Sequence, residues 1–172
     1  MSKSDIEANK AIVRNWVNAF NGRDIDSLAA VMHEDFVWNT AVQADDAPNE
    51  LRPLQSNLLR GRNLAHRHPR LNRQETITSY TNLFNGLVGK LDSSQISQPA
   101  SRSDNFMRLQ ILGITAEGDR VALEAQSSGL THPRTGRHYQ NFYHILFRIK
   151  DGKVMLLKEY QDTLHLFDFT SE

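Results

Sequence analysis

Four polar residues near the C-terminus, Asn141, Tyr143, Glu159 and Gln161, have side chains that can orient a small molecule or move a proton. A carboxyl group enclosed by apolar residues has its charged form disfavoured, and its pKa rises towards the range useful for proton transfer. A phenol or a carboxamide can hold a carbonyl or hydroxyl group. These residues can act together only if the strands that carry them turn them to one face.

The turn between the last two strand-like runs decides which residue lies opposite Glu159. A three-residue loop, KDG, sets Tyr143 opposite Glu159. A two-residue turn at Asp151-Gly152 sets His144 there and would allow a His-acid dyad. The preceding run, FYHILFRI, is apolar on both faces, so the hydrophobic pattern leaves both registers open.

The other histidines predict no metal site. His66 and His68 have a spacing that could ligate a metal, but no acid or third histidine accompanies them, which favours a solvated basic loop. His33 follows an expected helix and precedes Glu34 and Asp35, so a favourable charge at the helix C-terminus accounts for it.

The composition excludes several classes of protein. The 172 residues contain no cysteine, which rules out disulfides and cysteine-based zinc sites. Twenty Lys and Arg balance 20 Asp and Glu, whereas nucleic-acid binders usually carry a basic excess. The sequence has no glycine-rich phosphate loop and no serine in a nucleophile elbow. We therefore expect neither a nucleic-acid partner nor nucleotide or acyl-enzyme chemistry.

Membrane insertion and secretion are not expected either. The apolar run at residues 154–157, like every other apolar run in the sequence, is far shorter than the roughly 20 residues of a membrane span. The N-terminal sequence MSKSDIEANK is charged and lacks the apolar segment of a secretory signal. These features predict a soluble, cytoplasmic protein.

Three helices are expected in the first half of the chain. Ser4 and Glu7 have capping-box spacing before an apolar stripe that runs to Phe20, and Gly22 should end that helix. Asp24 or Asp26 can cap a second, short helix, which precedes the β-prone sequence FVWNT. A third helix should start at Asn72, with Glu75 three residues on. Its inner face would comprise Ile77, Tyr80, Phe84, Leu87 and Val88, with Gly89 after its end.

Antiparallel strands dominate the second half. From about Ser103, four strand-like runs are separated by the turn signals EGD, HPRTG and KDG. Short turns between strands form hairpins, so the fold class is α+β in one domain. Residues 40–72, which hold three of the five prolines, are too long for a plain connection and are interpreted as an insertion or lid.

The chain resembles the NTF2-like superfamily, in its ketosteroid isomerase and SnoaL-like polyketide cyclase branch. The resemblance lies in the three helices, the segment AFNGRDIDSLAAVMHEDFVWN and the closing segment DGKVMLLKEYQDTL. The C-terminal stretch from PRTGRHYQNFYHILF onwards is also similar to the limonene epoxide hydrolases. The match covers about 1–40 and 73–169.

This resemblance implies a cone: a curled sheet around the helices that encloses an apolar cavity, with no metal or organic cofactor. It favours the three-residue loop, and it places Glu159 where the epoxide hydrolases have a catalytic aspartate. Glu159, Tyr143 and Asn141 would then be catalytic. The cavity wall would comprise Trp16, Trp38, Thr40, Phe84, Ala125, Ser127, Ile145, Phe147, Leu157 and Gln161. The outer face, with Tyr139, Phe142, His144 and Leu146, would bind a second copy.

Departures from the family patterns exclude two named activities. The isomerase base would align at Thr40, and its oxyanion tyrosine and acid at Trp16 and Ile145. The arginine and first aspartate of the epoxide hydrolase triad would align at Ala125 and Ser127. The hypothesis is therefore a cofactor-independent isomerase, cyclase, dehydratase or lyase acting on an apolar oxygenated molecule. The alternative is a non-catalytic small-molecule-binding or dimeric scaffold protein.

Overall fold

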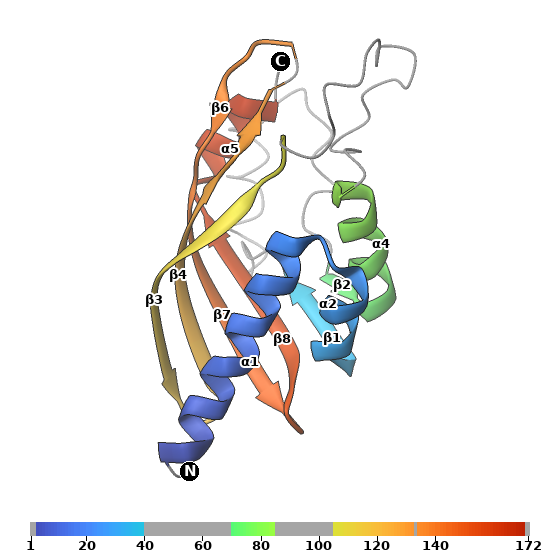
Figure 1. Ribbon diagram of the computed structural model, residues 1–172, viewed down its shortest axis with the longest axis vertical. Coiled ribbons are helices and arrows are strands. Elements are labelled where there is room, and N and C mark those ends of the chain that lie inside the picture. Colours follow the sequence, from blue (N-terminus) through green and yellow to red (C-terminus); the bar gives the residue numbers. More distant parts are fainter. Residues whose placement is uncertain (1–2, 40–69, 85–104, 133, 171–172) are drawn as a thin grey trace, which may run out of the picture.

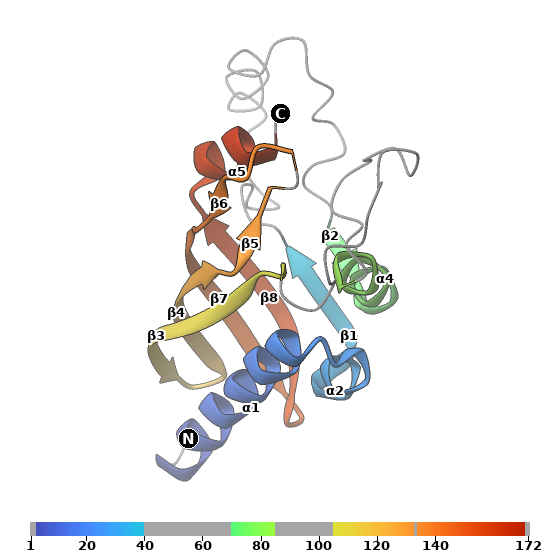
Figure 2. The same ribbon diagram turned by 45° about the horizontal axis from the view of Figure 1, so that its top comes forward.

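The computed structural model describes residues 3–39, 70–84, 105–132 and 134–170. A six-stranded mixed sheet carries α1, α2 and α4 on one face, and α5 lies at one end of it (Figure 1; Figure 2). The helices are α1 (Lys3–Gly22), α2 (Ile25–Val31), α4 (Arg73–Phe84) and α5 (Thr163–Thr170). The strands are β1 (Met32–Asn39), β2 (Arg70–Asn72), β3 (Arg108–Glu117), β4 (Arg120–Ser128), β5 (Leu130–Thr131), β6 (His138–Tyr139), β7 (Phe142–Lys150) and β8 (Lys153–Gln161).

The first two helices meet at a tight corner. Helix α1 already includes Lys3, so Ser4 lies within its first turn and is not the cap that the sequence predicts. The helix ends at Gly22 as expected, although Arg23 is the residue with left-handed backbone, at φ 56°. Asp24, and not Asp26, caps α2 by accepting a hydrogen bond from the Ser27 amide at 2.9 Å.

The predicted capping box at the start of α4 is confirmed. The Asn72 side chain accepts from the Glu75 amide at 2.9 Å, and the Glu75 carboxylate accepts from the Asn72 amide at 2.8 Å. Tyr80 is buried on the inner face of this helix, as expected. Leu87, Val88 and Gly89 lie outside the described residues, as does Thr40 with most of the 40–72 insertion.

The sheet has the order β2-β1-β8-β7-β4-β3, in which only β1 and β8 run parallel among the described strands. The predicted α+β class is confirmed, and the four expected C-terminal strand runs are β3, β4, β7 and β8. The sheet is open at β2 and β3 and curls less strongly than the expected cone (Figure 2).

The expected two-residue turn of the last hairpin is confirmed, but neither Tyr143 nor His144, the two expected partners, lies opposite Glu159. The turn has two residues, Asp151 and Gly152, at φ 51° and 70°, and it pairs Lys150 with Lys153. A bulge at Met155 then shifts the pairing by one residue, so Ile145 lies opposite Glu159. Together the turn and the bulge displace the pairing by two residues from the register that the three-residue loop predicts. Because side chains alternate with a period of two, each residue of β7 and β8 still lies on the face predicted for it.

The inner face of the sheet forms the core. Val121, Leu123, Ile145, Phe147 and Leu157 are all buried against the helices. On the outer face, Phe142 and His144 are exposed and Leu146 is half-buried, as the expected faces require.

Tyr139 corrects the predicted outer face because its side chain is buried. The strand breaks after Tyr139, so β6 pairs with β5 in a separate two-stranded sheet. Tyr139 nevertheless keeps the inward parity of Asn141 and Tyr143, with exposed Gln140 and Phe142 between these residues. Helix α5 covers it, with Phe169 and His165 ring centroids 4.9 and 5.5 Å from that of Tyr139.

Candidate functional site

Glu159 lies on the inner face of β8, next to the aromatic residues of β1 and α4. In the parallel β1–β8 pair, Trp38 is the partner of Leu157, which precedes Glu159 on the same face. The Glu159 side chain is half-buried. The carboxyl group therefore sits at the border between the packed core and the accessible end of the inner face.

Burial raises the pKa of Glu159 to about 7. The indole N–H of Trp38 opposes this effect and lowers the pKa slightly. No positive charge from the described part of the chain acts on the carboxyl group. The group is thus poised to accept and return a proton near neutral pH.

An aromatic wall surrounds this carboxyl group. Tyr80 stacks on Trp38, with ring centroids 5.1 Å apart, and meets Trp16 edge to face at 6.1 Å. Phe84 stacks on Tyr80 at 6.0 Å and contacts Phe20 at 5.7 Å. Burial, with the Glu159 charge as a smaller cause, raises the pKa of Tyr80 well above its ordinary value, so this phenol is neutral. The wall offers planar apolar surface with few polar atoms.

A buried cluster of hydroxyl and amide groups lies beside Glu159. The Tyr139 and Tyr143 hydroxyls are 2.9 Å apart, and Tyr139 also lies 3.4 Å from the Gln161 carboxamide oxygen. Tyr143 faces Gln161 directly across the strands, which puts it on the diagonal from Glu159. Burial, the neighbouring Tyr139 and the Glu159 charge raise the pKa of Tyr143, which is therefore a neutral donor.

Asn141 holds this cluster together and has no free amide donor. Its Nδ2 donates to the Tyr139 hydroxyl and to the Asp162 carbonyl, both at 3.0 Å. Its Oδ1 accepts from the Phe142 amide at 2.8 Å, and its own backbone amide donates to the Ser127 hydroxyl at 2.9 Å. Both hydrogens of the Asn141 side-chain amide are therefore already bonded within the protein, one of them to Tyr139.

The predicted cavity wall divides into a filled part and an accessible part. Trp16, Ala125, Ser127, Ile145, Phe147 and Leu157 are each at most 2% exposed, so they pack the core. Trp38, Phe84 and Gln161 keep partly accessible side chains, as does Glu159. A ligand therefore meets the accessible group first, and contact with the Tyr143 hydroxyl, which is only 6% exposed, requires a rearrangement of the side chains around it.

Two residues of the site, Tyr139 and Tyr80, are not expected there from the sequence. Tyr139 is missed because it is expected on the outer face with Phe142, His144 and Leu146, although it has the parity of the inward-facing Asn141 and Tyr143 and is buried. Tyr80 is expected on the inner helix face but only as core. Its proximity to Glu159 depends on tertiary packing, which the helical period does not reveal.

His144 and His33 take no part in this site. His144 pairs with Tyr160 on the outer face, so the alternative dyad with Glu159 is wrong. His33 is buried in β1, and its Nδ1 accepts the Asp35 amide at 3.0 Å. His33, Glu34 and Asp35 bring possible ligand atoms within 4.8 Å of one another, but this backbone bond occupies one of them. His66 and His68 lie outside the described residues.

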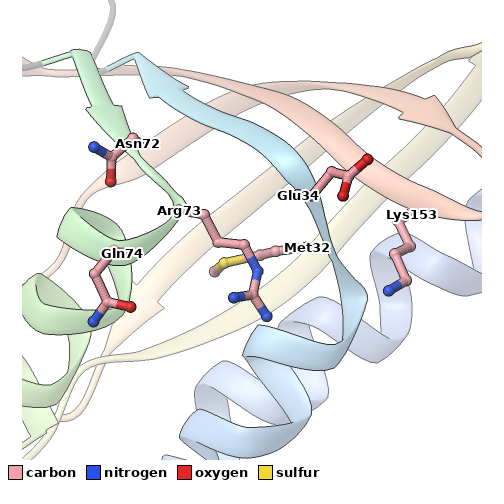
Figure 3. Close-up of a pocket in the computed structure, with 6 residues that line it drawn as sticks. All are labelled: Met32, Glu34, Asn72, Arg73, Gln74 and Lys153. Carbon is pink, nitrogen blue, oxygen red and sulfur yellow. The ribbon is translucent and has the colours of Figure 1, made fainter.

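Glu159 lines neither of two open hollows found among the described residues, although Tyr143 and Gln161 contribute to the second. One, of about 510 Å³, is lined by Met32, Glu34, Asn72, Arg73, Gln74 and Lys153 (Figure 3). Its Arg73 guanidinium already donates to the Ala29 carbonyl at 2.8 Å, which ties α4 to α2. The other, of about 430 Å³, is on the outer sheet face, where Leu112, Phe142 and Tyr160 are exposed. Neither has the enclosed acid that the inner site provides.

The fold is shared with solved structures at low sequence identity. An NTF2-like protein of unknown function from Burkholderia pseudomallei is 17% identical, covers 100% of both chains and has a TM-score of 0.62. A proposed SnoaL-like polyketide cyclase from a Jannaschia species is 17% identical over 96% of this chain and 93% of its own, with a TM-score of 0.60. An LEH-like epoxide hydrolase from Mycobacterium tuberculosis is 16% identical over 96% and 90%, with a TM-score of 0.58.

These likenesses confirm the resemblance at the level of the fold: the chain has the α+β fold of NTF2-like structures. No protein-family model matches the sequence, and no curated protein matches it. Among the described helices, none has the length and apolarity of a membrane-spanning segment. Function must therefore be argued from the site.

Proposed function

We propose that the protein is a cofactor-independent enzyme that moves a proton on an apolar, oxygenated small molecule, with Glu159 as the acid-base group. The supporting observation is a carboxyl group between Trp38 and the Tyr139–Tyr143 pair, with no opposing cation from the described residues. Structural ion pairs also perturb carboxyl groups, but those lower the pKa, whereas burial raises this one.

In the proposed mechanism, ionised Glu159 removes a proton from a carbon next to a carbonyl group of the substrate. Negative charge moves to the carbonyl oxygen, and the neutral Tyr143 hydroxyl donates a hydrogen bond to it. Protonated Glu159 then returns the proton to a second carbon, which gives an isomer. Attack of the enolate on a second carbonyl gives a cyclised product, and loss of a β-hydroxyl as water gives a dehydrated one.

The distance between the Glu159 carboxyl group and the Tyr143 hydroxyl favours a substrate about as large as a carbon ring. Diagonal neighbours across an antiparallel pair are roughly 7 Å apart, which long side chains can bridge with a bound molecule between them. Tyr139 supports Tyr143 from behind, and Asn141 fixes Tyr139 in turn.

Solvent deuterium exchange tests this proposal without knowledge of the net reaction. A panel of cyclic enolisable ketones is incubated with the protein in D2O, and deuterium incorporation at the α-carbon is followed by NMR. Glu159→Gln should lower the protein-dependent exchange rate by roughly 100-fold or more, because general-base catalysis typically contributes that much. Glu124→Gln, which changes an exposed glutamate on the outer face of β4, is the matched control. Equal exchange by the Glu159 variant and the wild type would overturn the assignment.

Association through the outer sheet face is a second candidate function, alone or alongside catalysis. Leu112, Phe142 and Tyr160 are 50%, 62% and 47% exposed around the outer hollow, where an ordinary soluble surface would be polar. A second copy could cover this patch through a two-fold contact, which would make the protein a homodimer.

Sedimentation velocity tests the dimer. Phe142→Glu should shift the protein to a monomer, because it places a charge at the centre of the apolar patch. Leu164→Glu, on the 78% exposed Leu164 of α5, is the control and should leave the sedimentation coefficient unchanged. A wild-type protein that sediments as a monomer at micromolar concentration would refute the dimer.

A further inference from the structure

Two indole N–H groups in the aromatic wall have no partner among the described residues. Trp16 Nε1 and Trp38 Nε1 are both buried and make no hydrogen bond with any residue described in the structure. Buried donors are normally satisfied, and leaving one unpaired costs about 1–3 kcal/mol. Where such a donor lies beside an accessible acid, we expect a ligand atom to bind and accept its hydrogen bond.

Trp38 is the better placed of the two donors. Its N–H is close enough to Glu159 to lower the pKa of the carboxyl group, yet no hydrogen bond of normal geometry joins them. The Trp38 and Glu159 side chains are both partly accessible, whereas Trp16 is only 2% exposed and packs against Phe147. The N–H and the carboxyl group thus form a donor and an acceptor side by side, with the Nε1 atom itself buried and other parts of both residues accessible.

We propose that Trp38 and Glu159 together bind a hydroxyl group on an uncharged, planar ring compound. The indole N–H donates a hydrogen bond to the hydroxyl oxygen, and the carboxylate accepts a hydrogen bond from the hydroxyl group. This inference rests on the proposed function because it assigns the substrate class of the same site. A hydroxyl group is both donor and acceptor, so it satisfies both partners at once.

The charge of the site excludes anionic ligands. An ionised carboxylate ligand would place a second negative charge beside Glu159, and the titratable groups of the described residues that interact with Glu159, namely Tyr80, Tyr139 and Tyr143, are neutral phenols. Like charges in a poorly solvated site repel strongly. The ring surfaces of Trp38, Tyr80 and Phe84 favour a flat apolar body for the ligand.

Equilibrium dialysis with three matched probes tests the proposal: naphthalene, 2-naphthol and 2-naphthoate at pH 8. For the wild type we expect 2-naphthol to bind about five- to tenfold more tightly than naphthalene, the gain of one to two hydrogen bonds. We expect 2-naphthoate to bind more weakly than naphthalene. Glu159→Gln should remove the penalty on 2-naphthoate.

Trp38→Phe keeps the aromatic surface and removes the donor. It should reduce the preference for 2-naphthol over naphthalene to less than twofold, while Trp16→Phe leaves that preference unchanged. Naphthalene affinity in each variant reports whether the site is still folded. An unchanged preference in Trp38→Phe, or a wild type with no preference for the hydroxyl, would overturn the proposal.

The two tryptophans of the chain provide a direct second readout. Addition of 2-naphthol should move the Trp38 indole N–H signal downfield in a ¹⁵N–¹H spectrum, with assignment from the Trp16→Phe variant; a stationary signal would refute the contact. Binding and turnover are separate measurements. Loss of the hydroxyl preference alone overturns this inference, whereas loss of the Glu159 effect on deuterium exchange alone overturns the proposed function.

Discussion

Ile145 lies directly opposite Glu159 across the β7–β8 pair, and Tyr143 lies opposite Gln161. A two-residue turn at Asp151-Gly152 followed by the bulge at Met155 produces this register. Because Ile145 is apolar, the position directly opposite Glu159 offers the carboxyl group no polar partner. Burial of the Glu159 carboxyl group therefore raises its pKa, and Trp38 acts in the opposite direction.

The stability of the protein should fall as pH rises through the range in which Glu159 ionises. The folded chain holds this proton to about pH 7, whereas the unfolded chain releases it near 4.5. Because the folded state binds more protons between these values, the free energy of unfolding decreases from about pH 4.5 to pH 7. The decrease from this group is at most about 3 kcal/mol. Urea unfolding at a series of pH values measures it.

Glu159→Gln should flatten that slope and stabilise the protein at pH 8, since a neutral amide avoids the burial of charge. Glu124→Gln should leave the slope as it is in the wild type, because Glu124 is exposed on the outer face. If both variants follow the wild-type curve, Glu159 is not buried enough to titrate near neutrality in solution.

Much of the fold follows from local patterns in the sequence. The Asn72–Glu75 capping box, the Asp24 cap and the turns at Gly118 and Gly152 each depend on residues within a few positions of one another. These signals fix the order and type of the elements, and hence the α+β class. The bulge at Met155 has no comparable local signature, so the register across β7 and β8 could not be predicted.

The candidate site was predictable only where strand alternation continues unbroken. Glu159, Tyr143 and Gln161 face inward as expected, because the alternation of β7 and β8 is preserved beyond the bulge. Tyr139 has the same parity and is buried with them, although the strand is interrupted between β6 and β7. Tyr80 joins them through helix packing, a consequence of tertiary structure that no short window of sequence contains.

Tyr139→Phe should destabilise the protein by about 1–3 kcal/mol. The Tyr139 hydroxyl accepts from Asn141 and bonds Tyr143, so its removal leaves a buried amide donor unpaired. Tyr143→Phe should cost less, about 1 kcal/mol, because that hydroxyl has one strong partner and a weak contact with the Met107 sulfur at 3.5 Å. Equal effects in urea unfolding would show that the Asn141 bond contributes little.

Gly129→Ala should be more destabilising than Gly118→Ala. Both glycines have positive φ, at 88° and 58°, which costs an alanine about 1–2 kcal/mol. A Cβ on Gly129 would also lie 2.6 Å from the Phe106 carbonyl oxygen, while one on Gly118 would meet no atom within 4 Å. Thermal unfolding of the two variants separates the backbone effect, which they share, from the clash. A lower midpoint for Gly118→Ala would contradict this account.

A cross-strand disulfide should distinguish the observed register from the two expected ones. His144 lies opposite Tyr160, with ring centroids 6.4 Å apart, on the outer face of the sheet. Directly opposite residues bring their Cβ atoms to about 4.5–5.5 Å, close enough for a disulfide after a small adjustment. The chain has no other cysteine, so the double variant His144→Cys/Tyr160→Cys should oxidise to a single intramolecular bond. The register of the three-residue loop would instead favour His144→Cys/Lys158→Cys. Free-thiol titration after mild oxidation should show the first pair closed and the second open, and the opposite result would rule out the bulge at Met155.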